Sequence, residues 1–436
     1  MIGGAKSNHG SLWPWKGLGE VKRRRFLLGA GALALTSAAK ARAALVWPEQ
    51  GLMNPCLNGL PDNPQVRDFI ATAWQGLDAA KVWDSHTHLI GDGDSHQGAW
   101  ANPKMDSLAS PLQYIQKRFY LNASCVNNTP GNVDSSYIER MRKLVDGMRP
   151  GFKMLLFAFD TFHDENGQPD RDHSTFETPD SYAQSIAAAY PACFEWAASI
   201  HPYREDCVAA LDQAVKGGAR AVKWLPAAMG IDPSSPKCDR FYDALSRHDL
   251  PLITHAGHER AVHADELQGY GNPLLLRRAL DHRVRVVVAH CASEGQGIDL
   301  DQGHNGRKME NIELFARMMN EHRYDQHLFG DISALPQINR AQWLRYVLEH
   351  RDWHPRLLNG SDYPLPGVMP LFSAGHIADL GLLPVAAVEP LKQIRAHNPL
   401  LFDFALKRNL RAGNLSFANS VFETHDFFTR TQEKKT

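Results

Sequence analysis

Short apolar runs alternate along the chain with segments of helical periodicity. The run at residues 152–160 is almost continuously apolar, which is typical of a strand buried on both faces of a parallel sheet. From residue 219 onward the alternation of strand and helix patterns is regular. The pattern predicts strands at residues 81–89, 152–160, 194–201, 219–225, 251–255, 284–290, 326–333 and 356–362. It predicts helices near residues 64–77, 110–121, 135–148, 181–190, 204–216, 237–248, 272–282, 309–322 and 340–350, and at least two within 385–414.

These repeated strand-then-helix units indicate a parallel sheet. Eight of them between Val82 and Asp362 predict an α/β protein, a closed (β/α)8 TIM barrel followed by C-terminal helices. A doubly wound open sheet is the architectural alternative. No G-x-G-x-x-G or P-loop motif follows a predicted strand, so nucleotide binding has no support. The polar stretches 89–106, 161–180 and 224–238 are predicted to be loops that determine specificity.

The N-terminal residues 1–43 have the pattern of an export signal. The motif RRRFL at residues 23–27 resembles a twin-arginine signal, an apolar run covers 28–39, and Ala41-Arg42-Ala43 is an A-x-A cleavage pattern. We therefore expect interaction with the export machinery, cleavage after Ala43 and a periplasmic or secreted protein. A Sec signal, an uncleaved anchor and a basic disordered tail are the alternatives. Residues 44–80 are expected to form a lead-in segment on the outside of a barrel domain of residues 81–436.

The net charge of the chain is clearly negative once residues 1–43 are excluded. The remainder holds 39 basic and 47 acidic residues, a net charge of −8, which argues against non-specific binding of nucleic acid or anionic membranes. No internal apolar run approaches the roughly 20 residues of a membrane-spanning helix. The six cysteines include no C-x-x-C pair. Cys56 and Cys125 are candidates for a disulfide, which their spacing does not decide. A homo-oligomer is also left open, because the apolar pair of C-terminal helices could pack either on the barrel or on a partner subunit.

Candidate chemistry lies at the predicted strand ends. Residues two apart on a strand project to the same side, so His86 and His88 project together. Two neutral imidazoles on one strand form half of a zinc-type site, although an H-x-H pair alone is more often a pair of ordinary histidines. What changes this judgement is that ligand-type residues recur at later strands of the same barrel: Lys223, His255, His290 and Asp362.

The stretches that carry these residues are WDSHTHL, GGARAVKWLP, PLITHAGHE, VVVAHCAS, LFGDISA and LLNGSDYP, within residues 83–364. Together they resemble the amidohydrolase superfamily of metal-dependent hydrolases, most closely the amidohydrolase-related (amidohydrolase 2) branch. That branch also contains decarboxylases and hydratases that act on carboxylates.

The resemblance implies that His86, His88 and His255 bind a divalent metal, with Zn²⁺ the expected ion. It implies that Asp362 is both a ligand and the acid/base that moves the proton of a water activated by the metal. His290 would be either a ligand of a second metal or a catalytic imidazole that polarises the substrate. Three imidazoles and a carboxylate suit zinc.

Lys223 leaves two alternatives open. In two-metal members of the superfamily the corresponding lysine is carbamylated and bridges the metals, and burial favours the neutral amine that reacts with CO₂. Otherwise Lys223 is a free lysine that binds substrate or packs in the fold, and one metal is present. We favour one metal.

Further residues at strand ends could line the pocket, each with a structural role as the alternative: Asp84, His201, Trp224, His258, Glu259 and Asp331. The sequence thus predicts an exported metal-dependent hydrolase that acts on an amide, lactone or ester bond of a small molecule. One alternative is a metal-dependent non-oxidative decarboxylase, or a hydratase of an unsaturated carboxylate. A non-catalytic metal-binding barrel is the third hypothesis.

Overall fold

The structure is a computed structural model in which residues 48–262, 264 and 267–433 are described. The predicted export signal at residues 1–43 lies outside the described residues. Within this described part, no helix has both the length and the apolar character that crossing a bilayer requires.

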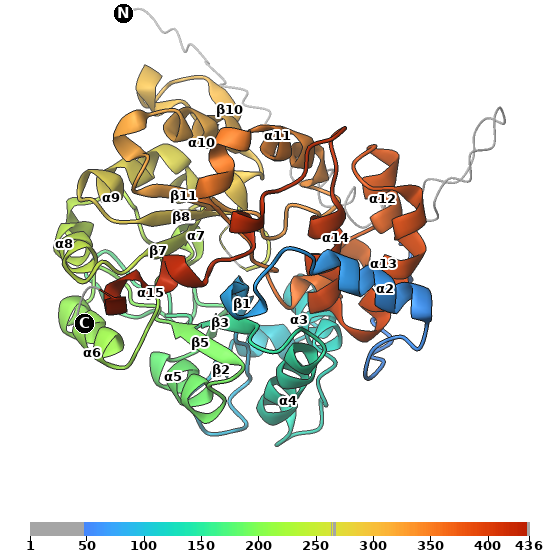
Figure 1. Ribbon diagram of the computed structural model, residues 1–436. Helices are drawn as coiled ribbons and strands as arrows, with labels where there is room; N and C mark the ends of the chain where they lie inside the picture. Colours follow the sequence, from blue (N-terminus) through green and yellow to red (C-terminus); the bar gives the residue numbers. More distant parts are fainter. Residues whose placement is uncertain (1–47, 263, 265–266, 434–436) are drawn as a thin grey trace, which may run out of the picture. The chain divides into compact units, whose positions relative to one another are not determined.

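Eight parallel strands of the described chain form a barrel (Figure 1). They pair as two sheets, in the orders β1-β3-β5 and β6-β7-β8-β11-β12. Parallel bridges join Ala198 to Val222 at one seam and Thr87 to Tyr363 at the other, which closes the barrel. The predicted (β/α)8 fold is confirmed, and each predicted strand is present. The strands are β1 (Trp83–His88), β3 (Lys153–Phe157), β5 (Phe194–Ala197), β6 (Val222–Trp224), β7 (Leu252–His255), β8 (Val286–Ala289), β11 (Leu328–Asp331) and β12 (Leu357–Leu358).

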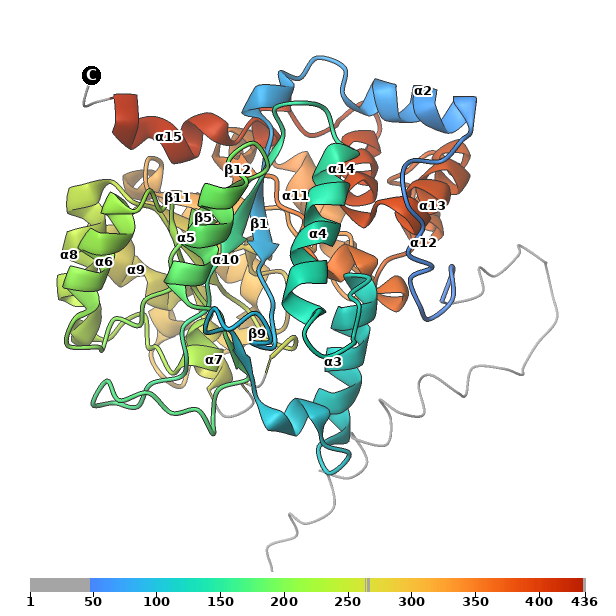
Figure 2. The same cartoon turned by 90° about the horizontal axis from the view of Figure 1, so that it is seen from below.

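Helices surround this barrel because each has one apolar face. In α8 the buried residues Phe241, Tyr242, Ala244 and Leu245 recur at helical spacing, so that face packs against the strands. The covering helices are α4 (Val133–Asp146), α5 (Asp180–Ala189), α6 (Cys207–Lys216), α8 (Asp239–His248), α9 (Arg277–Asp281), α10 (Asn311–Met319) and α11 (Leu344–Glu349). Figure 2 shows α3 (Pro111–Ala123) and α7 (Pro226–Met229) at the end of the barrel where the strands finish.

Some elements differ from the prediction. The helices expected at 272–282 and 340–350 each begin with a 3-10 turn, Pro273–Leu276 and Ala341–Trp343. Two predicted loops contain strands that pair antiparallel, β2 (Trp100–Ala101) with β4 (Phe176–Glu177). A second antiparallel pair, β9 (Gln296–Ile298) with β10 (Lys308–Glu310), was also not predicted. Strands of two or three residues are too short to show a readable alternation.

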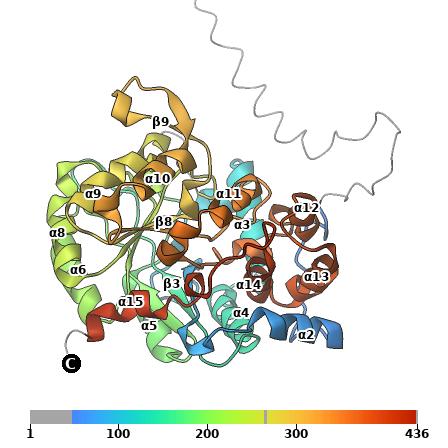
Figure 3. The ribbon, with the colours of Figure 1, turned by 45° about the horizontal axis from the view of Figure 1, so that its top comes forward.

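The lead-in segment packs against the C-terminal helices beside the barrel (Figure 3). The indole of Trp74 lies 4.3 Å from the ring of Phe404, measured between centroids. The disulfide Cys56–Cys125, which the sequence left open, joins this segment to the end of α3. The helices of this group are α2 (Pro64–Ala73), α12 (Ala374–Asp379), α13 (Val388–His397) and α14 (Pro399–Asn409).

The inside of the barrel is filled by apolar side chains from alternate strand positions. Along β3, Leu155 and Phe157 belong to the interior, whereas Met154 and Leu156 pack with the surrounding helices. The unpredicted helix α15 (His425–Glu433) lies across the end of the barrel where the strands begin (Figure 2). Its Phe427 and Phe428 belong to the same interior cluster. This end is therefore plugged, which leaves the opposite end for chemistry.

Candidate metal centre

His86 and His88 approach Asp362, which follows β12. The His88 Nε2 lies 3.1 Å from Asp362 Oδ1, and the His86 Nε2 lies 3.4 Å from the same oxygen. One ligand atom from each residue falls within 4.8 Å of the other two. His86 and Asp362 are buried, and His88 is partly exposed. The structure thus brings two predicted imidazole ligands and the predicted carboxylate ligand together.

Asp362 reaches this position because the segment after β12 packs closely on β1. A Cβ on Gly360 would lie 2.4 Å from the Cβ of His86, so a side chain at this position would block the approach. Asp84 Oδ1 accepts hydrogen bonds from the backbone N–H of Ser361, at 2.7 Å, and of His86, at 3.2 Å. The N–H of Asp362 donates to the His86 carbonyl at 2.8 Å. Asp84, a predicted pocket residue, therefore ties the two ligand-bearing segments together.

Asp331, at the end of β11, orients the ring of His86 through the Nδ1 atom. Its Oδ2 accepts a hydrogen bond from His86 Nδ1 at 2.8 Å, which leaves the Nε2 lone pair facing the other two predicted ligands. Its Oδ1 accepts the N–H groups of His290, at 2.9 Å, and of Ser333, at 3.0 Å. Burial lowers the pKa of His86 to about 4, so the ring is neutral at pH 7. Burial opposes ionisation of Asp331, but His86 and further hydrogen-bonding partners hold the pKa of its carboxyl below the usual range.

His290 follows β8 in a strained turn. The φ angles of His290, Cys291 and Ala292 are 56°, 49° and 52°, a left-handed conformation that costs each L-residue roughly 1–2 kcal/mol. The His290 Nδ1 lies 3.0 Å from the Ser333 carbonyl oxygen and 2.8 Å from its hydroxyl. This arrangement places the proton on Nδ1 and leaves Nε2 facing Asp362, whose Oδ2 is 3.7 Å away. Burial lowers the pKa of His290 well below its usual value, so this imidazole is also neutral.

Lys223, in β6, lies at the centre of the same site. Its Nζ is 3.1 Å from the Nε2 of His86, and the side chain is buried. Burial lowers the pKa of Lys223 to about 8, although Asp331 and Asp362 act in the opposite direction. A fraction of the amine is therefore neutral near pH 7. This placement is compatible both with a free lysine and with a carbamylated one.

His255, at the end of β7, lies next to this group. Its ring centroid is 5.3 Å from that of His290, its Nδ1 is 3.4 Å from Glu259 Oε2, and its Nε2 is 3.4 Å from the His258 carbonyl oxygen. Glu259 is also held by the N–H of Ala261, at 2.6 Å. Among the described residues, the ligand groups that meet within 4.8 Å do not include His255. Its role as the third imidazole ligand stays a prediction.

The match to a known family covers this whole site. The sequence profile of the amidohydrolase family matches residues 83–399. The chain belongs to the amidohydrolase family. No curated protein sequence matches it. Among solved structures, this amidohydrolase is similar to an uncharacterized TIM-barrel protein from Bordetella bronchiseptica, with 15% identity over 72% of this chain and 95% of that chain and a TM-score of 0.41. It is also similar to 4-oxalomesaconate hydratase from Rhodopseudomonas palustris, with 13% identity over 81% of this chain and 99% of that chain and a TM-score of 0.40. A third similar structure is 5-carboxyvanillate decarboxylase from Sphingomonas paucimobilis, with 11% identity over 72% of this chain and 96% of that chain and a TM-score of 0.41.

The residues of this amidohydrolase site fit a divalent cation. Two imidazole nitrogens and one carboxylate oxygen form a donor set that suits Zn²⁺, and the neutral state of His86 keeps its lone pair available. The hydrogen bond from His86 to Asp331 is the support that metal-binding histidines usually have. His86, His88 and Asp362 would hold the ion, with Lys223 and His290 beside it.

Two secondary candidates, His201 and Trp224, have structural partners instead. The His201 Nε2 lies 2.9 Å from the Met229 carbonyl oxygen. The Trp224 indole donates to the Ile200 carbonyl at 2.8 Å and stacks on Phe241. Both side chains are buried. These contacts give each side chain a role in packing.

A second acidic group also brings ligand-type atoms within 4.8 Å of one another: Asp92, Asp94 and Asp134. Its carboxylates are used by the backbone. Asp134 Oδ1 accepts the N–H of Asp92 at 2.9 Å, and Asp94 Oδ2 accepts the N–H of Val133 at 2.7 Å. These hydrogen bonds hold the backbone at the start of α4, and this structural role accounts for the clustering of the three carboxylates.

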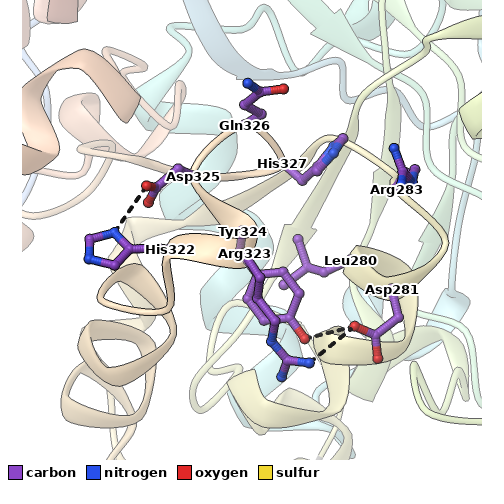
Figure 4. A pocket seen from close by; sticks show the side chains of 9 residues that line it. All are labelled: Leu280, Asp281, Arg283, His322, Arg323, Tyr324, Asp325, Gln326 and His327. Carbon is purple, nitrogen blue, oxygen red and sulfur yellow. Dashed lines mark hydrogen bonds and ion pairs between the residues drawn. The ribbon is translucent and has the colours of Figure 1, made fainter.

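One surface cavity of about 510 Å³ is lined by Leu280, Asp281, Arg283 and residues 322–327 (Figure 4). These residues precede β8 and β11, so the cavity lies at the end of the barrel where the strands begin. None of the predicted site residues lines it. Its polar side chains bond one another, as between Tyr324 and Asp281 at 2.9 Å. The cavity is therefore separate from the candidate metal centre.

Sequence reasoning missed Arg340, Ser333 and Lys407. Arg340 is buried and donates to Ser293 Oγ at 3.2 Å. Lys407, on α14, donates to the Gly360 carbonyl at 2.6 Å and so supports the segment that carries Asp362. Ser333 ends the predicted strand 326–333 and lies in the stretch LFGDISA, but a serine there has no chemistry that marks it as part of the site. Arg340 and Lys407 end no predicted strand, and no motif marks them.

Proposed function

We propose that this chain is an exported metal-dependent hydrolase that cleaves an amide, lactone or ester bond of a small molecule. The observation that carries the proposal is the meeting of His86, His88 and Asp362 within 4.8 Å, with His86 held neutral and oriented by Asp331. The donor atoms favour zinc as the ion bound there. Such an ion would supply Lewis acidity and would lower the pKa of a bound water molecule to about 7.

Two residues are proposed to move protons. Asp362 turns Oδ1 toward His86 and His88, so its Oδ2 can take a proton from the attacking water and return it to the leaving group. His290 keeps its proton on Nδ1, because that atom faces the Ser333 carbonyl oxygen. Its Nε2 is therefore an acceptor in the neutral state. This favours His290 as a proton acceptor or ligand over a role as a hydrogen-bond donor to the substrate.

We expect protein purified without chelators or added metal to contain one equivalent of zinc per chain. The change His86→Ala should remove it, because one of the three donor atoms and the contact to Asp331 are lost together. Elemental analysis of the purified protein measures both. His322→Ala is the matched control, since that side chain is 95% exposed, and it should keep the metal. Two equivalents would support a carbamylated Lys223 with His255 and His290 on a second ion, and metal-free wild-type protein would contradict the proposal.

A lyase of the same site is the second candidate. It is favoured by two buried cationic side chains, which suit a substrate that carries a carboxylate. Lys223 Nζ lies 3.1 Å from His86 Nε2, and Arg340 donates to Ser293, three residues after His290. Product analysis separates the candidates. Release of CO₂ without incorporation of oxygen from water would indicate decarboxylation, and addition of water to a double bond would indicate a hydratase.

We also propose that the chain is exported and that residues 1–43 are removed. The disulfide Cys56–Cys125 supports this, because disulfides persist in oxidising compartments. The mature chain should begin near Ala44, which mass spectrometry of protein from the native host would detect. Recovery of the intact chain beginning at Met1 from the cytoplasm would contradict export.

A further inference from the structure

Helix α14 carries a buried ion pair next to the segment that contains Asp362. Every residue of this helix from Pro399 to Lys407 is buried, and Asp403 and Lys407 are the two charged residues of that stretch. They lie one helical turn apart, with Lys407 Nζ 2.6 Å from Asp403 Oδ2. Burial raises the pKa of Asp403 to about 6, although Lys407 acts in the opposite direction, so the carboxyl is ionised at pH 7.

Stability alone does not account for this ion pair. Apolar residues of similar volume often replace a buried ion pair with no loss of stability, or even with a gain. Within the described part of the chain, Oδ1 of Asp403 has no hydrogen-bond partner, so this carboxylate serves to neutralise Lys407. Lys407 has a second contact, because its Nζ also donates to the Gly360 carbonyl at 2.6 Å. The reason for a lysine at this position therefore lies in the segment after β12.

The peptide group between Gly360 and Ser361 is held at both ends by charged side chains. Lys407 donates to its carbonyl oxygen at 2.6 Å, and Asp84 Oδ1 accepts its N–H at 2.7 Å. Hydrogen bonds to charged groups are roughly twice as strong as neutral ones, so the orientation of this peptide is fixed. Asp362 follows directly and has a φ angle of 62°, a left-handed conformation that L-residues disfavour.

We infer that Lys407, neutralised by Asp403, is a positioning residue for the proposed metal ligand Asp362. By holding the preceding peptide, it keeps Asp362 in the strained conformation that turns Oδ1 toward the two imidazoles of β1. Without this donor the peptide can rotate, and Asp362 can relax to an ordinary conformation that moves the carboxylate away. This inference rests on the proposed function and adds to it a residue from a helix outside the barrel.

Two variants separate positioning from stability. Lys407→Met should weaken zinc binding by roughly 10–100-fold, the usual effect of losing a group that supports metal ligands. It should also lower the melting temperature, because Asp403 becomes an unpaired buried charge. The double variant Asp403→Leu/Lys407→Met should regain the melting temperature but still bind zinc weakly, because no side chain donates to the Gly360 carbonyl. Competition against a zinc-binding dye and thermal unfolding of the metal-free protein measure the two effects.

Arg285→Met is the matched control. Arg285 is also a buried cation that contacts both a carboxylate and a backbone carbonyl, since it donates to Asp249 Oδ1 at 2.8 Å and to the Phe427 carbonyl at 2.9 Å. It precedes β8 and so lies at the end of the barrel where the strands begin. Arg285→Met should lower the melting temperature and leave zinc affinity unchanged.

Hydrogen exchange of the metal-free protein gives a readout that needs no metal. The N–H groups of Ser361 and Asp362 are bonded to Asp84 and to the His86 carbonyl, so they exchange only when this segment opens. Lys407→Met and the double variant should both speed exchange in the peptide that contains them. Arg285→Met should not.

Wild-type zinc affinity in folded Lys407→Met would overturn the inference. A double variant that recovers zinc affinity together with its melting temperature would do the same, and it decides alone if Lys407→Met does not fold. Failure of the proposed function looks different. In that case the wild-type protein binds no zinc, or binds it without hydrolysing any substrate, while replacement of Lys407 still speeds exchange at Ser361 and Asp362. Unchanged exchange there would contradict the positioning role.

Discussion

Asp362→Asn is expected to lower turnover of any substrate by roughly 10²–10⁴-fold, the usual contribution of a positioned acid/base. Asparagine keeps the shape of the side chain but removes the charge that lies 3.1 Å from His88 Nε2 and 3.4 Å from His86 Nε2. It also removes the oxygen proposed to move the proton. Steady-state kinetics on a substrate found by screening, together with metal analysis, measure the two effects.

The control for this change is Asp212→Asn. Asp212 on α6 also pairs with a histidine, His248, at 2.6 Å, but this pair lies on the outer layer of helices. Its loss should leave both turnover and metal content unchanged. Turnover by Asp362→Asn within a factor of a few of the wild type would refute the assignment of Asp362.

Asp331→Asn is expected to weaken metal binding by roughly 10–100-fold, the range measured for residues that support metal-binding histidines. The Asn Oδ1 can still accept the N–H groups of His290 and Ser333. The amide nitrogen, however, would then face His86 Nδ1 with a donor. His86 must move its proton to Nε2 to accept this bond, which removes the lone pair that faces the metal position.

A competition titration against a zinc-binding dye measures the affinity, and ¹⁵N shifts of the imidazole report which nitrogen carries the proton. Ser333→Ala is the comparison, because it removes a hydroxyl that contacts Asp331 but keeps the charge and the acceptor at His86. Its effect should be clearly smaller. Equal effects of the two changes, or an unchanged tautomer in Asp331→Asn, would contradict this mechanism.

The arrangement of the barrel could be predicted because its strands are buried on both faces. Such strands are short apolar runs, and β7 and β8 are typical examples. The helix α15 was missed, since its contribution to the core is one adjacent pair, Phe427 and Phe428, with no periodic pattern. The pairing of β2 with β4 was missed for a related reason, because it depends on two distant loops meeting.

The candidate site, too, could be predicted only in part. Convergence of His86, His88, Lys223, His290 and Asp362 follows from one rule, that all strands of a parallel barrel end at the same face. The role of Asp331 does not follow, because that residue at a strand end is equally compatible with lining the pocket. Only the contact to His86 Nδ1 distinguishes the two.

The sequence by itself determined the family, the order of the strands and the residue types at their ends, because these depend on local apolar runs and short motifs. The tertiary structure decided which atoms of those residues meet. The left-handed turn at His290, the close packing of Gly360 on His86 and the burial of Arg340 against Ser293 arise from segments far apart in the chain. Backbone angles and side-chain rotamers at such contacts are set by packing, which local sequence patterns do not encode.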